Sequence, residues 1–299
     1  MSSKNAILGM FFLAFTSGQV QAEILFEAFY RIEKNGRHTG YVVQRVSSDG
    51  KGHKTASTYV RTKFGDKELF STSKSVAKAG KGTPVESVHS SDNTGAPFRI
   101  AADFKDNQGL VTFYSSKSKK SAIVEKAQPA PFPSAFLFYA ADLPKLQHDK
   151  KYNYTAFFEE SGRTQVGQLS VLGSKAPGPS GAKNILHVLN DDSGQPVENF
   201  IAESGEPLGS RSEVTGSVCF WVATKEEAVG TMTYPTGEMT SLFGDLPQGK
   251  KNPWSTLRGF DSSALIKSFQ TWDGNRSVSS TPATSEVLPL PLVLPVRGL

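Results

Sequence analysis

The sequence has little of the chemistry on which most catalytic and metal sites depend. It contains one cysteine, Cys219, and five histidines among its 299 residues. A single cysteine excludes an internal disulfide framework. The histidines form neither an HxH nor an HExxH spacing, whereas a structural zinc site needs clustered ligands. No Gly-rich phosphate loop and no Gly-x-Ser-x-Gly nucleophile motif occurs either. We therefore expect no metal site and no cofactor.

Charge of one sign and long apolar runs are also scarce. The formal net charge is only +5, and the basic residues are scattered except for small groups at 117–120 and 250–251. Without a motif of basic and aromatic residues, this charge does not predict nucleic-acid binding. The one marked apolar run, residues 6–15, is too short to span a bilayer, which takes about 20 residues. We expect at most peripheral contact with a membrane.

The N-terminus has the pattern of a secretory signal peptide. Lys4 precedes the apolar run at 6–15, and Ser17-Gly18 ends that run. Small side chains around Ala22 then fit a signal peptidase site. No cysteine follows the apolar run, so a lipid-modified N-terminus is not expected. The sequence predicts cleavage after Ala22 and a periplasmic or secreted mature protein that begins at Glu23.

From Ile24 to about Val124 the pattern is that of consecutive β-hairpins. Apolar and polar residues alternate with a period of two, which is typical of strands with one buried face. Asn35-Gly36 lies between two such segments, and Asn-Gly is the strongest short hairpin signal because both residues tolerate positive φ. Gly65-Asp66 marks the next hairpin. We expect a curved antiparallel sheet here.

Prolines at positions 129, 131 and 133 interrupt this pattern. The apolar segment 134–143 is predicted as a short helix with Ser134 as its cap. Thr224 and Glu227 have the spacing of a capping box and predict another short helix. Further strands are expected at 152–159, 165–172, 184–189, 197–202 and 213–222, a last helix near 262–269, and a disordered or extended tail that is rich in proline.

Together these patterns predict an all-β fold of mainly antiparallel, curved, half-barrel-like sheets with one to three short helices. The predicted organisation is a signal peptide at 1–22, a β-meander domain at 23–127, a second β-rich domain or a continuation of the same sheet at 128–230, an irregular segment with a short helix at 231–274, and a Pro-rich tail at 275–299.

The segment from Phe26 to Arg45, FEAFYRIEKNGRHTGYVVQR, resembles the opening strand pair of a widespread group of periplasmic β-rich domains of unknown function. That opening also occurs upstream of transglutaminase-like domains. The resemblance extends to about Gly230 through the Pro-marked break, the strands around Tyr152 and Gly167, and the motifs Asp192-Ser193-Gly194-Gln195-Pro196 and Thr224-x-Glu226-Glu227-Ala228. It implies half-barrel-like sheets in the periplasm and no established chemistry.

Cys219 is the one candidate nucleophile, and two interpretations of it remain open. Transglutaminases place the cysteine before the histidine, but every histidine here precedes Cys219. Cell-wall L,D-transpeptidases have the matching order, and His187 followed by Thr215-Gly216-Ser217-Val218-Cys219 partly resembles their motif. Val218 replaces their glycine, however, and the expected basic residue after the cysteine is missing. The alternative is a buried core cysteine in the apolar run VCFWV.

Aromatic residues are the other feature with a functional interpretation. They are numerous enough either to pack a sheet core or to line the concave side of a strongly curved sheet. In the second case we expect an exported, non-enzymatic protein of the cell envelope that binds a lipid, a glycolipid or an envelope partner. The Cys219–His187 transpeptidase is the alternative. The candidate ligand-binding residues are Phe26, Tyr30, Tyr41, Phe98, Phe136 and Tyr139.

Overall fold

The computed structural model describes residues 22–80, 82–92, 97–105, 108–115, 123–137, 149–172, 185–191, 196–202 and 207–249. The predicted signal peptide, the helix expected at 262–269 and the Pro-rich tail lie outside these ranges. Within them, fourteen strands form one antiparallel sheet, so the all-β prediction is confirmed. Neither of the two α-helices in this part of the chain has the length and apolarity needed to cross a bilayer.

The strands of this sheet are β1 (Glu23–Lys34), β2 (Arg37–Ser48), β3 (His53–Phe64), β4 (Lys67–Lys78), β5 (Pro84–Asp92), β6 (Phe98–Lys105), β7 (Gln108–Ser115), β8 (Ile123–Ala127), β9 (Lys151–Phe158), β10 (Arg163–Leu172), β11 (Ile185–Asp191), β12 (Val197–Ala202), β13 (Pro207–Ser212) and β14 (Ser217–Val222). Except for β8 and β9, strands that are consecutive in the chain pair with one another as hairpins.

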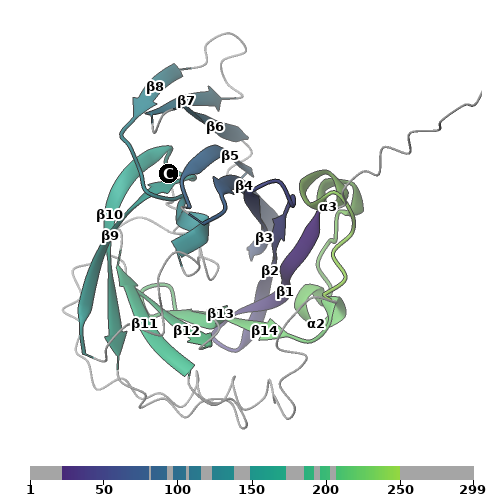
Figure 1. Cartoon of the computed structure of the whole chain (residues 1–299). Coiled ribbons are helices and arrows are strands. Elements are labelled where there is room, and N and C mark those ends of the chain that lie inside the picture. Colours follow the sequence, from purple (N-terminus) through teal and green to yellow (C-terminus); the bar gives the residue numbers. More distant parts are fainter. Residues whose placement is uncertain are drawn as a thin grey trace, which may run out of the picture.

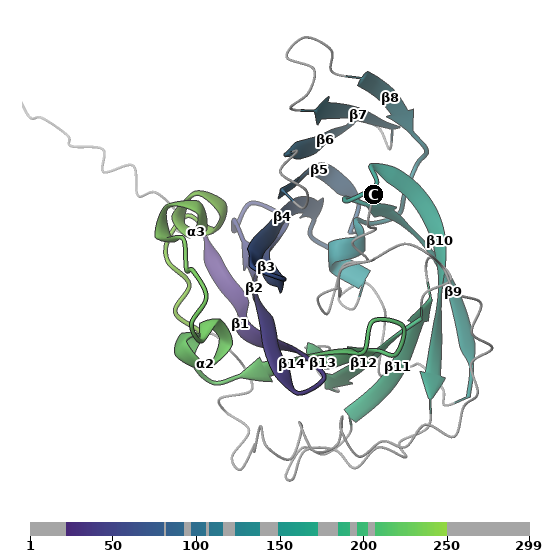
Figure 2. The ribbon, with the colours of Figure 1, turned by 180° about the vertical axis from the view of Figure 1, so that it is seen from behind.

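The spatial order of the strands is β8 through β1, then β14 back through β9. The first strand is therefore paired with the last, and β8 and β9 form the two edges. Strands from the ranges 23–127 and 128–230 belong to the same sheet. Figures 1 and 2 show that this sheet curls into an open, barrel-like shell. It has an inner face, toward the axis of the curl, and an outer face.

The first hairpin illustrates how local sequence sets this architecture. Asn35 and Gly36 both have positive φ, at 52° and 71°. Two such residues make the tight turn whose twist matches the flanking strands. The turn fixes the register of β1 against β2, with Tyr30 opposite Val42 and Arg31 opposite Tyr41. Because successive strand residues point to opposite faces, this register assigns the side chains between the two register shifts, Phe26 to Ile32 on β1, to one face or the other.

The segment after β14 covers the outer face of β1 to β3. It contains α2 (Lys225–Val229) and α3 (Thr236–Phe243), which lie outside the curl in both views. The predicted capping box of α2 is confirmed. The Thr224 hydroxyl accepts a hydrogen bond from the Glu227 N–H at 3.2 Å, and the Glu227 carboxylate accepts one from the Ala223 N–H at 3.1 Å.

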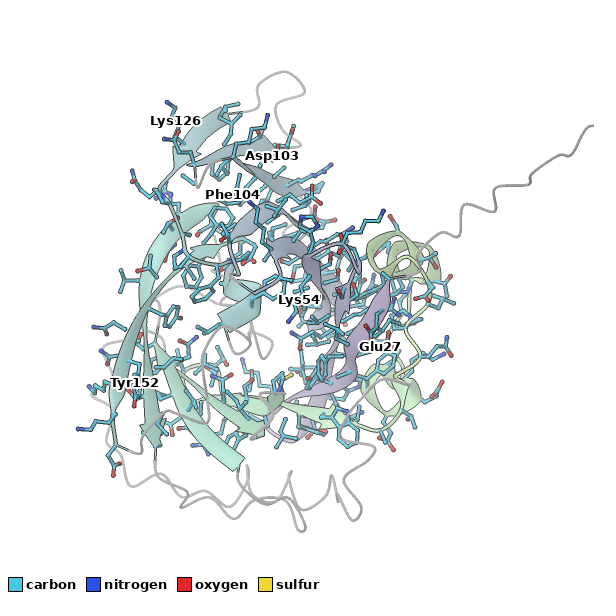
Figure 3. The ribbon with its side chains drawn as sticks, viewed as in Figure 1. Glu27, Lys54, Asp103, Phe104, Lys126 and Tyr152 are labelled. Atoms are coloured by element: carbon cyan, nitrogen blue, oxygen red, sulfur yellow. The ribbon has the colours of Figure 1, made fainter. Side chains whose placement is uncertain are left out.

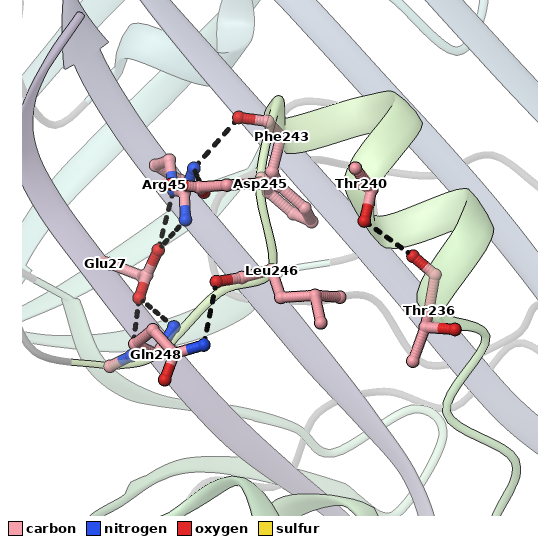
Figure 4. A network of polar contacts seen from close by, with 9 residues as sticks. Glu27, Arg45, Thr236, Thr240, Phe243, Asp245, Leu246 and Gln248 are labelled. Carbon is pink, nitrogen blue, oxygen red and sulfur yellow. Dashed lines mark hydrogen bonds and ion pairs between the residues drawn. The ribbon is translucent and has the colours of Figure 1, made fainter. Parts of the chain in front are cut away.

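A buried ion pair fastens this segment to the sheet (Figure 4). Glu27 on β1 and Arg45 on β2 are both almost fully buried, and they form an ion pair through the Arg45 guanidinium. Arg45 also donates to the Phe243 carbonyl at 2.9 Å and to Asp245 at 2.5 Å. Glu27 accepts from the Gln248 N–H at 2.6 Å and from the Gly249 N–H. Both charges are therefore compensated by partners far away in the sequence.

The sheet closes by packing between its two arms. The tip of the β9–β10 hairpin lies against the inner side of β6 and β7, where a Cβ atom on Gly162 would meet Val111 and Phe113 at 2.8 and 2.9 Å. Phe157 joins Val111 in a small apolar cluster, and its ring is edge-on to Phe104 at 4.9 Å between centroids. Contact between side chains therefore holds this arm in place.

The chain between β8 and β9 enters the curl, and the part of the predicted helix at 134–143 that the structure describes begins as a 3₁₀ turn. Residues Ser134–Phe136 form a single 3₁₀ turn, η1, and residues 138–148 lie outside the described ranges. Ser134 is not its cap: Pro133 occupies that position and makes no side-chain cap hydrogen bond. The Ser134 hydroxyl instead bonds a buried carboxyl group, so tertiary contact has overridden local capping.

Candidate functional site

The inner face of β2 to β5 carries a row of buried polar side chains. The register places Gln44 opposite Thr58, Thr58 opposite Ser73, and Ser73 opposite His89. Gln44 belongs to the inner face because its neighbour Arg45 bonds the outer segment. The row therefore crosses four adjacent strands without interruption.

The two flanking rows extend this polar surface. One contains Ser71 opposite Ser91, and the other contains Ser75 opposite Ser87. Across β2 to β6 the three rows hold no Asp, Glu, Lys or Arg. We call the polar members the inner polar strip, and all of them are buried: Gln44, Thr58, Ser71, Ser73, Ser75, Ser87, His89 and Ser91.

Several atoms of the inner polar strip have no hydrogen-bond partner among the residues that the structure describes. These are both amide atoms of Gln44, Nε2 of His89 and Oγ of Ser91. Gln44 is 2% exposed and His89 is 1% exposed. Buried polar atoms are nearly always hydrogen-bonded, and an unpaired one costs about 1–3 kcal/mol. These atoms lie in adjacent rows of one face. The described part of the sheet does not use them for hydrogen bonds.

Of the two ring nitrogens of His89, only Nδ1 has a hydrogen-bond partner among the described residues. Its Nδ1 lies 2.8 Å from the Ser73 hydroxyl, and its ring lies 5.6 Å from the Phe98 ring. Burial lowers the pKa of His89 to about 4, so the imidazole is neutral near pH 7. If Ser73 donates to Nδ1, then Nε2 carries the proton; if Nδ1 donates, then Nε2 accepts. His89 thus presents either a donor or an acceptor to the interior.

Glu159 borders the strip from the β9–β10 turn. Its carboxyl group is fully buried and accepts hydrogen bonds at 2.5 Å from the Ser75 and Ser134 hydroxyls, with the Ala135 N–H at 3.3 Å. Burial is the largest effect on this group and raises its pKa, although these hydrogen bonds oppose the rise. Glu159 therefore connects η1 to β4. Its raised pKa favours the uncharged carboxyl group in the interior.

The structure distributes the predicted aromatic residues over different surroundings. Phe26, Tyr30 and Phe136 belong to the main apolar core, and the Tyr30 hydroxyl donates to the Pro207 carbonyl at 2.9 Å. Phe98 packs with the smaller cluster beside His89. Tyr139 lies outside the described residues.

Tyr41 is separated from the other candidates by the sheet itself. It shares the outer face with Arg31, and its hydroxyl donates to the Thr233 carbonyl at 2.7 Å. Burial raises the pKa of Tyr41. Its ring stacks on Tyr59 and lies close to Tyr234, so it contributes to the contact with the outer segment.

The strand register keeps Cys219 and His187 apart. Cys219 is buried on β14, opposite Ser210, and this row continues to Val188 on β11. Three strand spacings correspond to roughly 14 Å. His187 occupies the neighbouring backbone position, opposite Phe200 and not in this row. The described backbone does not bring the two residues together as a thiol–imidazole pair.

Other charged groups do not assemble into a site for a metal ion in the described part of the chain, where no group of three His, Cys, Asp or Glu side chains converges. Figure 3 shows Glu27 beside the outer helical segment, far from Asp103 and Lys126 on the β6–β8 arm.

The sequence contains a pattern that corresponds to the inner polar strip, although the aromatic residues alone suggested the candidate site. Ser71-x-Ser73-x-Ser75 and Ser87-x-His89-x-Ser91 alternate with a period of two, and Gln44 stands between Val42 and Val46 on one face. Serine at alternate positions is typical of a solvated strand face. The pairing of β4 with both neighbours brings these residues together on one face, and the curl of the sheet turns that face inward.

Comparison with known proteins is limited to the level of the fold. No protein-family model matches the chain, and no curated protein matches it. A solved structure that is similar is a β-barrel-like protein of a domain of unknown function, DUF1849, from Brucella abortus. The two chains are 12% identical with a TM-score of 0.44, and the match covers 66% of this chain and 95% of the other.

Proposed function

We propose that the protein is exported and non-enzymatic, and that it holds an amphipathic ligand, a lipid or glycolipid, against the inner face of its curled sheet. The observation that carries this proposal is the set of polar atoms in the inner polar strip that have no hydrogen-bond partner among the described residues. Gln44, His89 and Ser91 together leave four such atoms buried. At about 1–3 kcal/mol each, they cost a large part of a stability that is typically 5–15 kcal/mol.

A ligand with hydrogen-bonding groups would supply the missing partners and remove this cost. The complex would therefore be more stable than the free protein. The rest of the inner face suits an acyl chain, because Tyr30, Val42 and Val60 form a buried apolar surface next to the strip. Each methylene group transferred from water to such a surface contributes about 0.8 kcal/mol. The signal-peptide pattern at residues 1–22 supports a location where lipids and glycolipids are available.

The direct test is analysis of what the protein carries. The full chain, expressed with its N-terminus intact and purified without detergent, is extracted and analysed by lipid mass spectrometry. We expect one class of lipid in near-stoichiometric amount, because a site with unpaired buried groups favours the occupied state.

Two leucine substitutions provide the matched control. Ser71→Leu places a larger apolar side chain on the inner face, whereas Ser90→Leu makes the same change on the outer face of β5. We expect the first to reduce the amount of lipid and the second to leave it unchanged. Extracts of the unmodified protein that contain no lipid in repeated preparations would contradict the proposal.

A further inference from the structure

We infer that the polar end of the ligand is uncharged and rich in hydroxyl or amide groups, and that Gln44 and His89 bind it at the two ends of the inner polar strip. This inference rests on the proposed function and adds the chemistry of the headgroup. It is carried by the position of the partnerless atoms and by the absence of charge around them in the described rows.

The two residues frame a surface of hydroxyl groups. Gln44 lies on β2 and His89 on β5, with Thr58 and Ser73 between them in the same row. Their Cα atoms are separated by three strand spacings, roughly 14 Å. Both side chains extend from the concave side of the curl, so their ends are closer together than their Cα atoms. This spacing suits a headgroup with several hydrogen-bonding groups, such as a polyol or a sugar.

The absence of charge argues against an ionic headgroup. The three rows of the strip contain no Lys or Arg, and a phosphate or carboxylate buried there would lack a counter-charge. Lys54 is a cation on the same face, but it lies four residues along β3 from Thr58, or about 13 Å. Glu159 is the carboxyl group that borders the strip, and its bonds to Ser75 and Ser134 already use it.

Hydroxyl groups also match the donors and acceptors that are present. Gln44 offers two amide hydrogens and one carbonyl oxygen, none of them bonded to a described residue. Nε2 of His89 is a donor in one neutral tautomer and an acceptor in the other. A hydroxyl group both donates and accepts, so it pairs with Gln44 and with either tautomer of His89. A headgroup with acceptors alone would satisfy only part of this set.

The test compares headgroups on one alkyl chain. Dodecyl maltoside is uncharged and rich in hydroxyl groups, dodecanoate is anionic, and dodecyltrimethylammonium is cationic. Each is titrated below its micellar concentration into the full chain, stripped of lipid, and the affinity is measured by isothermal titration calorimetry. We expect the maltoside to bind at least tenfold more tightly than either charged probe.

Variants locate the discrimination in the strip. Gln44→Leu should lower the affinity for the maltoside about tenfold and leave that for dodecanoate unchanged, because it removes two groups that only the maltoside uses. Gln168→Leu is the matched control, since Gln168 bonds Asn153 at an exposed position on β10. His89→Phe keeps a planar ring, removes Nε2, and tests the other end of the strip independently of whether Gln44→Leu folds.

The outcomes separate the two proposals. If no probe binds, the proposed function is contradicted and the headgroup inference falls with it. Equal affinities for all three probes, or tighter binding of a charged probe, would overturn the headgroup inference while the inner face remains a binding surface. The same conclusion follows if Gln44→Leu and His89→Phe both leave the preference for the maltoside unchanged.

Discussion

The two faces of β1 to β5 both bury polar side chains, but they differ in the partners that these side chains have. On the outer face, Glu27 and Arg45 form an ion pair, and the polar atoms of both side chains have partners in the sheet or in the segment after β14. On the inner face, one residue away in sequence, Gln44 is uncharged and has no described partner for either amide atom. Both faces are buried, and the described chain completes the Glu27–Arg45 pair but not Gln44. The Tyr234 hydroxyl, in the segment that covers the outer face, also has no described partner.

This difference indicates what each face is for. A buried ion pair with a full set of hydrogen bonds fixes one arrangement of the segment that covers it. A buried surface with unpaired groups is costly until something else supplies the missing partners. The outer face thus has the properties of a permanent internal interface, whereas the inner face leaves polar atoms without described partners, which is the basis of the proposed ligand site.

Breaking the ion pair on the outer face should have the largest effect. Arg45→Met leaves Glu27 as an uncompensated buried charge, which costs about 3–5 kcal/mol in unfolding free energy. Arg31→Met removes a partly exposed pair with Glu33, at 2.8 Å, and should cost about 1 kcal/mol or less. Equilibrium unfolding in urea measures both. Similar losses for the two variants would show that burial of the Glu27–Arg45 pair carries no special weight.

On the inner face, His89 should make stability depend on pH. Its pKa is about 4 in the folded protein and about 6.5 when unfolded. Below pH 6.5 the unfolded chain therefore takes up a proton that the folded protein does not, and stability falls as the pH drops toward 4. The loss should reach about 3 kcal/mol.

The contribution of His89 is obtained as a difference between proteins. Urea unfolding of the unmodified protein and of His89→Phe is compared from pH 7 to pH 4, and the variant should lack this part of the slope. His53→Asn is the control, because His53 is partly exposed and pairs with Asp49. Parallel pH profiles for the unmodified protein and His89→Phe would mean that His89 is protonated without cost.

The smallest expected effect is a gain in stability, which is unusual for a substitution of a buried residue. It therefore distinguishes the inner face from the outer face clearly. Gln44→Leu removes unpaired buried groups and should stabilise the lipid-free protein by about 1 kcal/mol, whereas Gln168→Leu should change stability little. Thermal unfolding of the stripped proteins is the measurement. A clear destabilisation by Gln44→Leu would show that the amide is hydrogen-bonded within the chain.

Local sequence predicted most of the strands because hairpins are local structures. Asn35-Gly36 and Gly65 both adopt the positive φ that their turns require, and the strands on either side follow from the alternation. The missed elements have weak local signals. Strand β13 begins at Pro207 and contains Gly209, so its place comes from pairing with β12 and β14 and not from its own propensity.

The site was less accessible to sequence analysis than the fold. Residue type identified the aromatic candidates, but only the curl shows that Tyr30 lies inside and Tyr41 outside. The inner polar strip was missed because serine-rich strands are normally solvated. Its inward orientation depends on the pairing of β1 with β14, which joins residues almost two hundred positions apart and has no local signature.

That same pairing sets the order of events during folding. Hairpins between neighbouring strands form within microseconds, but β1 meets β14 only after nearly all of the described chain is available. Until then β1 keeps an open edge, which is the kind of edge that recruits strands from other molecules. We therefore expect closure of this seam to be the slow step of folding, and any delay in it to favour association with other chains.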